Sequence, residues 1–259
     1  MSVLAIIPAR YASTRFPGKP LAMLQGKTII QWVWERVSAT PGISATIVAT
    51  DDQRILDVVQ SFGGRAMMTG TNHRSGTDRC GEVVSTLQSQ GQSFDIVVNV
   101  QGDEPFINAS QIADLISCFE SPSTQIATLK KPIANTEELL SPNNVKVVTD
   151  RCDNAIYFSR NPIPYLRGYE ADEWINRQPY YKHIGIYAFR SSTLSQLVKL
   201  TQSPLEKSES LEQLRWIENG FDIRVKATEF ENIGIDTPED LALAQSFIQT
   251  HPDILSSKK

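Results

Sequence analysis

Three cations are spaced along one short loop near the start of the chain, where they could together bind a polyphosphate. Arg10, Arg15 and Lys19 lie among proline, glycine and serine in residues 8–20. Guanidinium and ammonium groups donate charge-assisted hydrogen bonds to phosphate oxygens, and the two flanking prolines limit the entropy lost when a ligand is clamped. A solvated loop whose cations only aid solubility is the alternative interpretation.

A carboxylate follows an apolar run in the middle of the chain and could serve a divalent cation. Asp103 belongs to Gln101-Gly102-Asp103-Glu104-Pro105, directly after the run at residues 94–100. Mg²⁺ takes oxygen ligands and usually keeps several waters, so one or two carboxylates plus substrate phosphates suffice to bind it. An ordinary role as a turn residue is the alternative for Asp103.

Apolar runs that alternate with helical patterns place these residues at the ends of parallel strands. Residues 28–37 form an amphipathic pattern that is typical of a helix after the basic loop. Ligands of open α/β sheets bind at the carboxyl ends of the strands, so the loop and Asp103 are expected at one crevice. Between residues 126 and 181 strand patterns follow closely without long helices, which predicts an antiparallel or mixed extension. The expected buried strands cover residues 3–7, 45–50, 65–68 and 94–100.

Length and composition are compatible with a single α/β domain, and a domain plus an insertion fits them equally well. The 259 residues, 41% hydrophobic and 21% charged, are compatible with one domain over 1–259, to which 126–227 contributes an insertion. A formal net charge of −4 excludes a general nucleic-acid binder, and no segment has the length of a membrane span or a signal-peptide core. Cys80, Cys118 and Cys152 lack metal-type spacing, which indicates reduced thiols and a cytoplasmic protein.

Two common nucleotide-binding motifs are excluded. Gly26-Lys27-Thr28 looks like the end of a P-loop, but Leu21 stands where that motif needs its first glycine. No G-x-G-x-x-G occurs in the sequence, which counts against a dinucleotide-dependent dehydrogenase.

The motifs, taken in order, resemble those of the 3-deoxy-manno-octulosonate (Kdo) cytidylyltransferases, also called CMP-Kdo synthetases. The resemblance runs from Ile7 to about Leu241. The departures are Lys182 where the family has Arg, Asp78 where Glu is frequent, and residues 166–179, which carry no motif. The matching patterns are R-x-x-S-x-R-x-P-G-K-P-L from Arg10, H-x-S-G-T-D-R from His73, Q-G-D-E-P from Gln101, F-S-R-x-x-I-P from Phe158, H-x-G-x-Y from His183, P-L-E-x-x-E-x-L-E-Q-L-R from Pro204 and I-D-T-P-E-D from Ile235.

The predicted fold is α/β, with a Rossmann-like, mostly parallel sheet and an inserted mixed β extension. The resemblance implies the nucleotide-diphospho-sugar transferase type of this fold, Mg²⁺ as cofactor and a homodimer. It also implies transfer of CMP from CTP to the anomeric hydroxyl of Kdo, giving CMP-Kdo and pyrophosphate for lipopolysaccharide biosynthesis. Such chemistry needs positioning and charge neutralisation more than a protein nucleophile, which fits the absence of a convincing Ser-His or Cys-His arrangement.

The resemblance also implies roles for individual residues. Arg10, Lys19 and Asp103 would be catalytic residues, and Asp103 and Asp236 would bind the metal. The nucleotide would be bound by Ala9, Arg10, Arg15, Lys19, Ser75, Gly76, Thr77, Arg79 and Gln101. The sugar acid would be bound by Arg160, His183, Tyr187, Glu212 and Gln213.

Plainer interpretations stay open for several of these positions. Ser75 and Thr77 could only cap a helix, His183 and Tyr187 could be core groups on one strand face, and Asp236 could be a turn acid. We expect Asp51 and Asp52 to act as N-caps rather than to approach the base. Glu206 and Glu209 recur with Glu212 and Gln213 at helical steps, and we expect the first two on a solvated helix face.

Two rival functions use the same residues differently. Another sugar nucleotidyltransferase, acting on a sialic acid or an amino-Kdo, would share most of the motifs. A non-catalytic nucleotide-sensing module on the same fold would tolerate loss of Asp103 and Asp236, and this chain has both.

Overall fold

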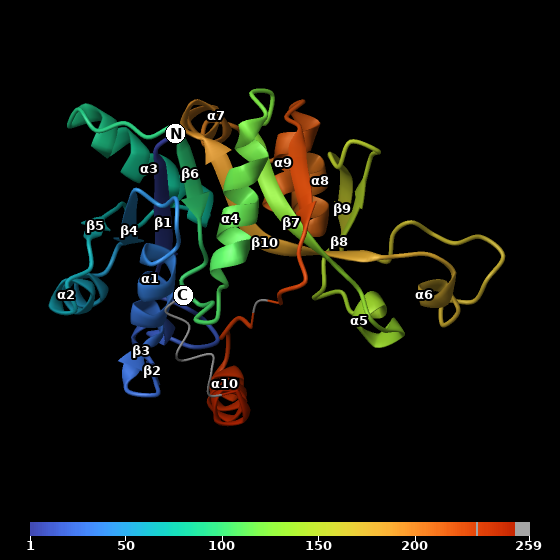
Figure 1. Ribbon diagram of the computed structural model, residues 1–259, viewed down its shortest axis with the longest axis horizontal. Helices are drawn as coiled ribbons and strands as arrows, with labels where there is room; N and C mark the ends of the chain where they lie inside the picture. Colours follow the sequence, from blue (N-terminus) through green and yellow to red (C-terminus); the bar gives the residue numbers. More distant parts are fainter. Residues whose placement is uncertain (232, 252–259) are drawn as a thin grey trace. The chain divides into compact units, whose positions relative to one another are not determined.

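The computed structural model describes residues 1–231 and 233–251, which form two compact units (Figure 1). The first unit comprises residues 1–113 and 233–251, and the second comprises Asp114–Glu231. Within the described residues, no helix is both long enough and apolar enough to cross a membrane.

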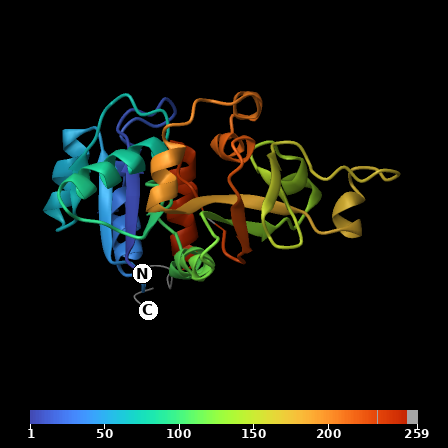
Figure 2. The same cartoon turned by 90° about the horizontal axis from the view of Figure 1, so that it is seen from above.

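Four parallel strands, shown in blue to green in Figure 2, form the sheet of the first unit in the order β6, β1, β4, β5. β1 (Val3–Ala9) lies between β6 (Ile96–Asn99) and β4 (Ala45–Thr50), and β5 (Ala66–Met68) pairs with β4. The apolar residues of β1 are buried because an inner strand of a parallel sheet is covered on both faces. The carboxyl ends of the four parallel strands share one edge of the sheet, so the loops that follow these strands gather there.

Four helices of the first unit begin after a residue whose side chain accepts a hydrogen bond from a main-chain N–H. Thr28, Asp52, Ser75 and Thr237 cap these four helices, which confirms the cap predicted at Asp52 and the capping interpretation of Ser75. The short elements are η1 (Lys19–Leu21), β2 (Met23–Leu24) and β3 (Lys27–Thr28). The longer helices are α1 (Ile29–Ser38), α2 (Gln53–Ser61), α3 (Gly76–Ser89), α4 (Ala109–Ser117), which ends in the second unit, and α10 (Pro238–Thr250).

The second unit holds a mixed sheet. β10 runs antiparallel to β7, β11 runs parallel to β7, and β8 pairs with β9 and, through Lys146 and Lys182, with β10. Its strands are β7 (Ile126–Pro132), β8 (Lys146–Thr149), β9 (Ala155–Ser159), β10 (Tyr181–Arg190) and β11 (Ile223–Ala227). The expected α/β class, with a mostly parallel Rossmann-like sheet and a mixed β extension, is therefore confirmed.

The helices of the second unit are short. Residues 166–179, which carry no motif, pack through Trp174 against Leu139 of α5 and Tyr180. The helices are η2 (Cys118–Glu120), α5 (Thr136–Leu140), α6 (Trp174–Arg177), α7 (Ser191–Leu197), α8 (Pro204–Glu209) and α9 (Glu212–Glu218).

The helical pattern after residue 203 contains a break. Ser210 adopts a left-handed conformation with φ 52°, which ends α8 before α9 begins. The helical spacing through Glu206, Glu209, Glu212 and Gln213 is therefore interrupted, because α8 carries the first two residues and α9 the last two.

Candidate active site

A polar cavity of about 500 Å³ opens at the carboxyl edge of the parallel strands in the first unit. Its walls come from the loop after β1, the start of α3 and the turns that contain Asp103 and Asp236. The predicted residues that line it are Ala9, Arg10, Arg15, Lys19, Ser75, Gly76, Arg79, Gln101, Asp103 and Asp236. Thr77 is not among its lining residues and is not a cap either, since it lies inside α3 with 3% of its surface exposed.

The backbone of the basic loop is bent so that Lys19 starts a short helix. Gly18 has φ +73°, a left-handed conformation that favours glycine, and its N–H donates to the carbonyl of Tyr11 at 2.9 Å. The Tyr11 ring lies so close that a Cβ on Gly18 would sit 3.0 Å from it. The loop therefore closes on itself, and Lys19 extends from the first residue of η1.

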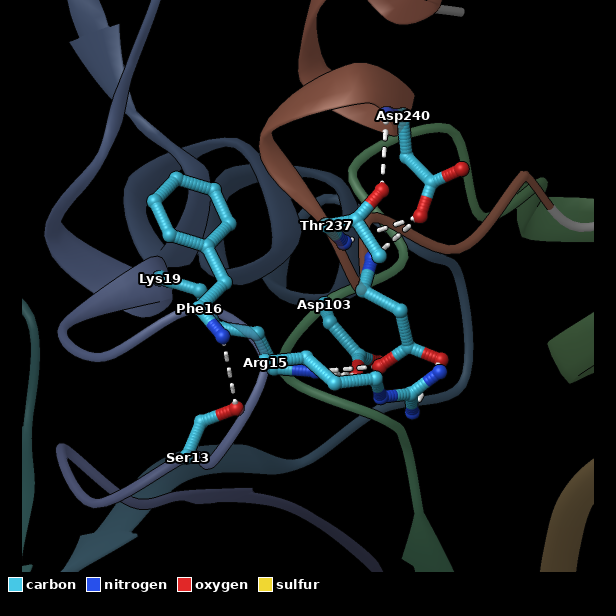
Figure 3. A network of polar contacts seen from close by, with 8 residues as sticks. Ser13, Arg15, Phe16, Lys19, Asp103, Thr237 and Asp240 are labelled. Atoms are coloured by element: carbon cyan, nitrogen blue, oxygen red, sulfur yellow. Dashed lines mark hydrogen bonds and ion pairs between the residues drawn. The ribbon is translucent and has the colours of Figure 1, made fainter.

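Lys19 joins the two acidic turns (Figure 3). Its Nζ contacts the Asp103 carboxylate and lies 2.9 Å from Oδ1 of Asp236. Arg15 approaches Asp236 as well, with Nη2 2.9 Å from Oδ2. The main-chain N–H of Ile235 donates to the Asp103 carbonyl at 2.9 Å, which ties the two turns together. Residues from both ends of the first unit thus converge on one point.

Electrostatics hold this cluster in its charged form. Burial alone would lower the pKa of Lys19, but the charges and hydrogen bonds of Asp103 and Asp236 outweigh it and raise that pKa. Burial would raise the pKa of Asp236, whereas Lys19 and Arg15 outweigh burial and lower it. Both groups are therefore ionised at neutral pH.

Each acidic turn has a local structural reason. A Cβ on Gly102 would lie 2.7 Å from the main-chain carbonyl of Pro8, so only glycine lets the Asp103 turn approach the end of β1. On the other side, Thr237 caps α10 in a capping box with Asp240, whose Oδ2 also accepts the Asp236 N–H at 3.0 Å.

Arg79 forms a buried ion pair at the back of the cavity. Only 1% of its surface is exposed, and its Nη2 lies 2.9 Å from Oδ2 of Asp51 while its guanidinium also contacts the Thr69 hydroxyl. The predicted cap role of Asp51 is wrong, because this ion pair occupies its carboxylate and Asp52 caps α2. Sequence reasoning missed the pair because its two residues come from different elements.

In the second unit, three of the predicted sugar-binding residues lie close together. The rings of His183 and Tyr187 are 5.3 Å apart, and Tyr187 packs edge-on against Trp216 of α9 at 5.0 Å. Burial and then the charge of Glu212 raise the pKa of Tyr187, so its hydroxyl stays protonated. Glu212 is itself held by Arg215, with Nη2 2.8 Å from Oε1.

The protonation of His183 follows from its surroundings. Burial lowers its pKa to about 3, so the imidazole is neutral at physiological pH. Its Nε2 lies 2.9 Å from the Thr128 hydroxyl oxygen, which also lies 2.8 Å from the carbonyl of Ile186 and 3.1 Å from that of Ile184. Donation from this hydroxyl to either carbonyl would leave its oxygen free to accept from Nε2–H.

Arg160 and Gln213 complete the predicted set. Arg160 Nε donates to the Glu209 carbonyl at 2.7 Å, and its two terminal nitrogens reach the carbonyls of Pro142 at 3.1 Å and Ser210 at 3.4 Å. Nε2 of Gln213 is buried and, within the described residues, has no hydrogen-bond partner. A buried donor left unpaired is costly, so this N–H needs a partner such as a water or a ligand.

Comparison with family models matches residues 4–229 to the cytidylyltransferase family. The chain belongs to this family. Two curated relatives named 3-deoxy-manno-octulosonate cytidylyltransferase, from Phocaeicola vulgatus and Thermodesulfovibrio yellowstonii, are 52% and 48% identical to it. These alignments cover 96% and 97% of this cytidylyltransferase and 98% and 100% of the relatives. The resemblance stated from the motifs is thus confirmed.

Solved structures agree with this assignment. A CMP:2-keto-3-deoxy-manno-octonic acid synthetase complexed with CTP has a TM-score of 0.88 and 40% identity, covering 97% of this chain and all of the other. A 4-diphosphocytidyl-2C-methyl-D-erythritol synthase from Anaerococcus prevotii has a TM-score of 0.58 at 17% identity, with 96% and 98% coverage. The second likeness shows the fold alone.

Two acidic residues of this cytidylyltransferase do not lie on a solvated face as we expected. Glu206 is buried in the capping box of α8, with Oε2 3.2 Å from Nε of Arg215. Glu209 accepts from the Ser159 hydroxyl at 2.7 Å and from the Arg160 N–H at 2.9 Å. Their partners come from other elements, so helical spacing alone could not find them.

Lys182, the departure from the family motif, has a structural explanation. Its Nζ contacts the carboxylates of Glu138 and Glu231, and these outweigh its burial and raise its pKa. Lys182 therefore supplies a buried positive charge that the two glutamates neutralise.

Proposed function

We propose that this cytidylyltransferase transfers CMP from CTP to the anomeric hydroxyl of Kdo, giving CMP-Kdo and pyrophosphate, the activation step of lipopolysaccharide biosynthesis. The observation that carries the proposal is the first-unit cavity, where Lys19 and Arg15 meet the carboxylates of Asp103 and Asp236. Relatives that are about half identical over nearly their full length are named for the same reaction.

Arg10, Arg15 and Lys19 would bind the triphosphate. They line one cavity together with main-chain groups of Ala9 and Gly76, which suits a ligand with several anionic oxygens. Charge develops on the departing pyrophosphate as the bond to the α-phosphorus breaks, and preorganised cations stabilise it without reorganisation. Ser75, Arg79 and Gln101 line the same cavity and would hold the cytidine.

Asp103 and Asp236 fit Mg²⁺. Their carboxylates already converge on one cationic group, the Lys19 ammonium, so two oxygen donors are available at one point. The described residues contain no group of three or more metal-ligating side chains, and we infer that phosphates and waters complete the coordination. When bound, Mg²⁺ would neutralise phosphate charge and lower the pKa of a bound hydroxyl.

The second unit would bind the sugar acid. The Arg160 guanidinium matches a carboxylate in plane, while Tyr187, Glu212 and Gln213 offer groups that read hydroxyls. Neutral His183 can hold a sugar oxygen without adding charge. The anomeric hydroxyl would then attack the α-phosphorus in line with the departing pyrophosphate.

We also propose that the chain acts as one nucleotidyltransferase domain, in which 126–227 supplies sugar binding and the contact of a homodimer. Its three free cysteines suit a reducing compartment, in support of a cytoplasmic location.

A pyrophosphate-release assay tests the proposal. CTP, UTP and ATP are each combined with Kdo, with amino-Kdo and with a sialic acid in the presence of Mg²⁺. The proposal predicts rapid release from CTP with Kdo and much slower release from every other pair. Preference for another sugar acid would indicate a related nucleotidyltransferase, and binding of CTP without release in any pair would indicate a nucleotide-sensing module.

A further inference from the structure

Lys146 is a buried lysine whose ammonium contacts main-chain carbonyls. It opens β8, and none of its surface is exposed. Its ammonium donates to the main-chain carbonyls of Ser141 at 2.9 Å, Asn144 at 2.6 Å and Arg160. An ammonium has three N–H donors, so each is satisfied by one carbonyl. Within the described residues no carboxylate lies within ion-pairing distance of its Nζ. Burying a cation this way is costly, so the arrangement is expected to serve a purpose.

The main chain of Arg160 is held from both sides. Lys146 binds its carbonyl, and Oε2 of Glu209 accepts its N–H at 2.9 Å. Oε1 of Glu209 accepts the hydroxyl of the preceding Ser159 at 2.7 Å. The end of β9 therefore cannot move without breaking charge-assisted hydrogen bonds.

The guanidinium of Arg160 is also held in one orientation, by three main-chain carbonyls. Its bonds to the carbonyls of Glu209, Pro142 and Ser210 use one N–H on each of its three nitrogens. A guanidinium has five N–H groups, so one remains on each terminal nitrogen. One N–H on each terminal nitrogen is what a guanidinium needs to engage a carboxylate bidentately.

We propose that Lys146 and Glu209 are positioning residues that fix Arg160 as the receptor for the carboxylate of the sugar acid. The inference rests on the proposed function and extends it, because it assigns selection of an acidic sugar to two residues that need not touch the sugar.

The test compares variants by their KM for Kdo and for CTP in the pyrophosphate-release assay. Glu209→Gln keeps the shape of the side chain but removes one acceptor, and Lys146→Met removes all three donors. Each is expected to raise KM for Kdo about tenfold, the scale of one charge-assisted hydrogen bond, with KM for CTP unchanged. Lys130→Met is the matched control, because Lys130 is also buried in the second unit but binds Thr149 and Asp153.

A double-mutant cycle separates positioning from general stability. If both residues act through Arg160, Glu209→Gln or Lys146→Met should add little to the rise in KM for Kdo caused by Arg160→Ala. Additive effects, an equal shift in KM for CTP, or the same shift in Lys130→Met would overturn the inference. If Lys146→Met does not fold, the Glu209→Gln cycle decides. No release by the wild-type protein with Kdo and CTP would instead refute the proposed function.

Discussion

At the scale of single residues, the position of Lys19 has consequences for the order of binding. Its ammonium contacts both carboxylates that we assign to the metal. A divalent cation that binds without nucleotide must displace Lys19 and compete with Arg15, whereas nucleotide phosphates would draw both cations away. Metal and nucleotide should therefore bind cooperatively.

Replacing Lys19 with Met should affect catalysis and metal binding in opposite directions. Turnover should fall by about a hundredfold or more, because developing negative charge on pyrophosphate loses a preorganised partner. The affinity for Mn²⁺ alone, followed by electron paramagnetic resonance, should increase because the competing cation is gone. Lys27→Met is a suitable control, since Lys27 pairs with Glu35. Unchanged kcat and KM for CTP in Lys19→Met would refute the assignment.

His183 should make folding sensitive to acid. Its pKa is about 3 in the folded state and ordinarily 6.5, so the unfolded chain binds more protons between these values. The free energy of unfolding contributed by this group is complete above pH 6.5 and declines as the pH falls, by up to about 1.4 kcal/mol per pH unit. Urea titrations from pH 4 to 8 should show a shallower pH dependence in His183→Gln. An identical slope in both proteins would contradict a buried neutral imidazole.

At the scale of elements, sequence patterns predicted the strands and helix caps, which depend on residues that are neighbours in the sequence. The apolar run at residues 3–7 forms β1, and Asp52 caps α2 as expected, because the pattern of buried residues and the helix caps are local properties. The ion pair of Arg79 with Asp51, and the hydrogen bond that the Arg160 main-chain N–H donates to the Glu209 carboxylate, join distant elements. Side-chain spacing within one helix carries no information about them.

The break between α8 and α9 also escaped sequence reasoning. A helix end in the left-handed conformation is usually marked by glycine, and here the residue is Ser210. The turn persists because Arg160 binds the carbonyls of Glu209 and Ser210 from outside the helices. The contacts of Arg160 therefore stabilise a helix end that no glycine marks in the sequence.

Two substitutions at Ser210 should separate the shape of this turn from its chemistry. Ser210→Gly should keep activity, because glycine adopts φ 52° without strain. Ser210→Val should lower the free energy of unfolding by about 1–2 kcal/mol and raise KM for Kdo, because a β-branched residue resists that conformation. Equal stability of the two variants in urea titrations would show that the turn is not constrained.

At the scale of the whole molecule, the proposed function places each substrate on a different unit. The cavity residues belong to the first unit, and Arg160, His183, Tyr187, Glu212 and Gln213 belong to the second. Asp103 and Asp236 lie on either side of the second unit in sequence and still meet at Lys19. On this proposal, changes in the second unit would alter sugar specificity and leave Asp103 and Asp236 in place.

This division predicts that variants of the second unit change sugar binding alone. Glu212→Ala should raise KM for Kdo about tenfold and leave KM for CTP unchanged, because Glu212 lies beside Tyr187 and Arg215 in the second unit. Steady-state kinetics with each substrate varied in turn checks this. A shift confined to KM for CTP would mean that the sugar site is wrongly assigned.

The most direct test of the account measures Mg²⁺-dependent pyrophosphate release by the wild-type protein, Asp103→Asn and Asp236→Asn with CTP and Kdo. Asparagine is nearly isosteric, so both variants should fold, which unfolding curves verify. The account predicts that each loses at least about a hundredfold in activity, because the carboxylates hold the cation that neutralises phosphate charge. Full Mg²⁺-dependent activity in both variants would contradict it, since Asp103 and Asp236 would then be ordinary turn residues.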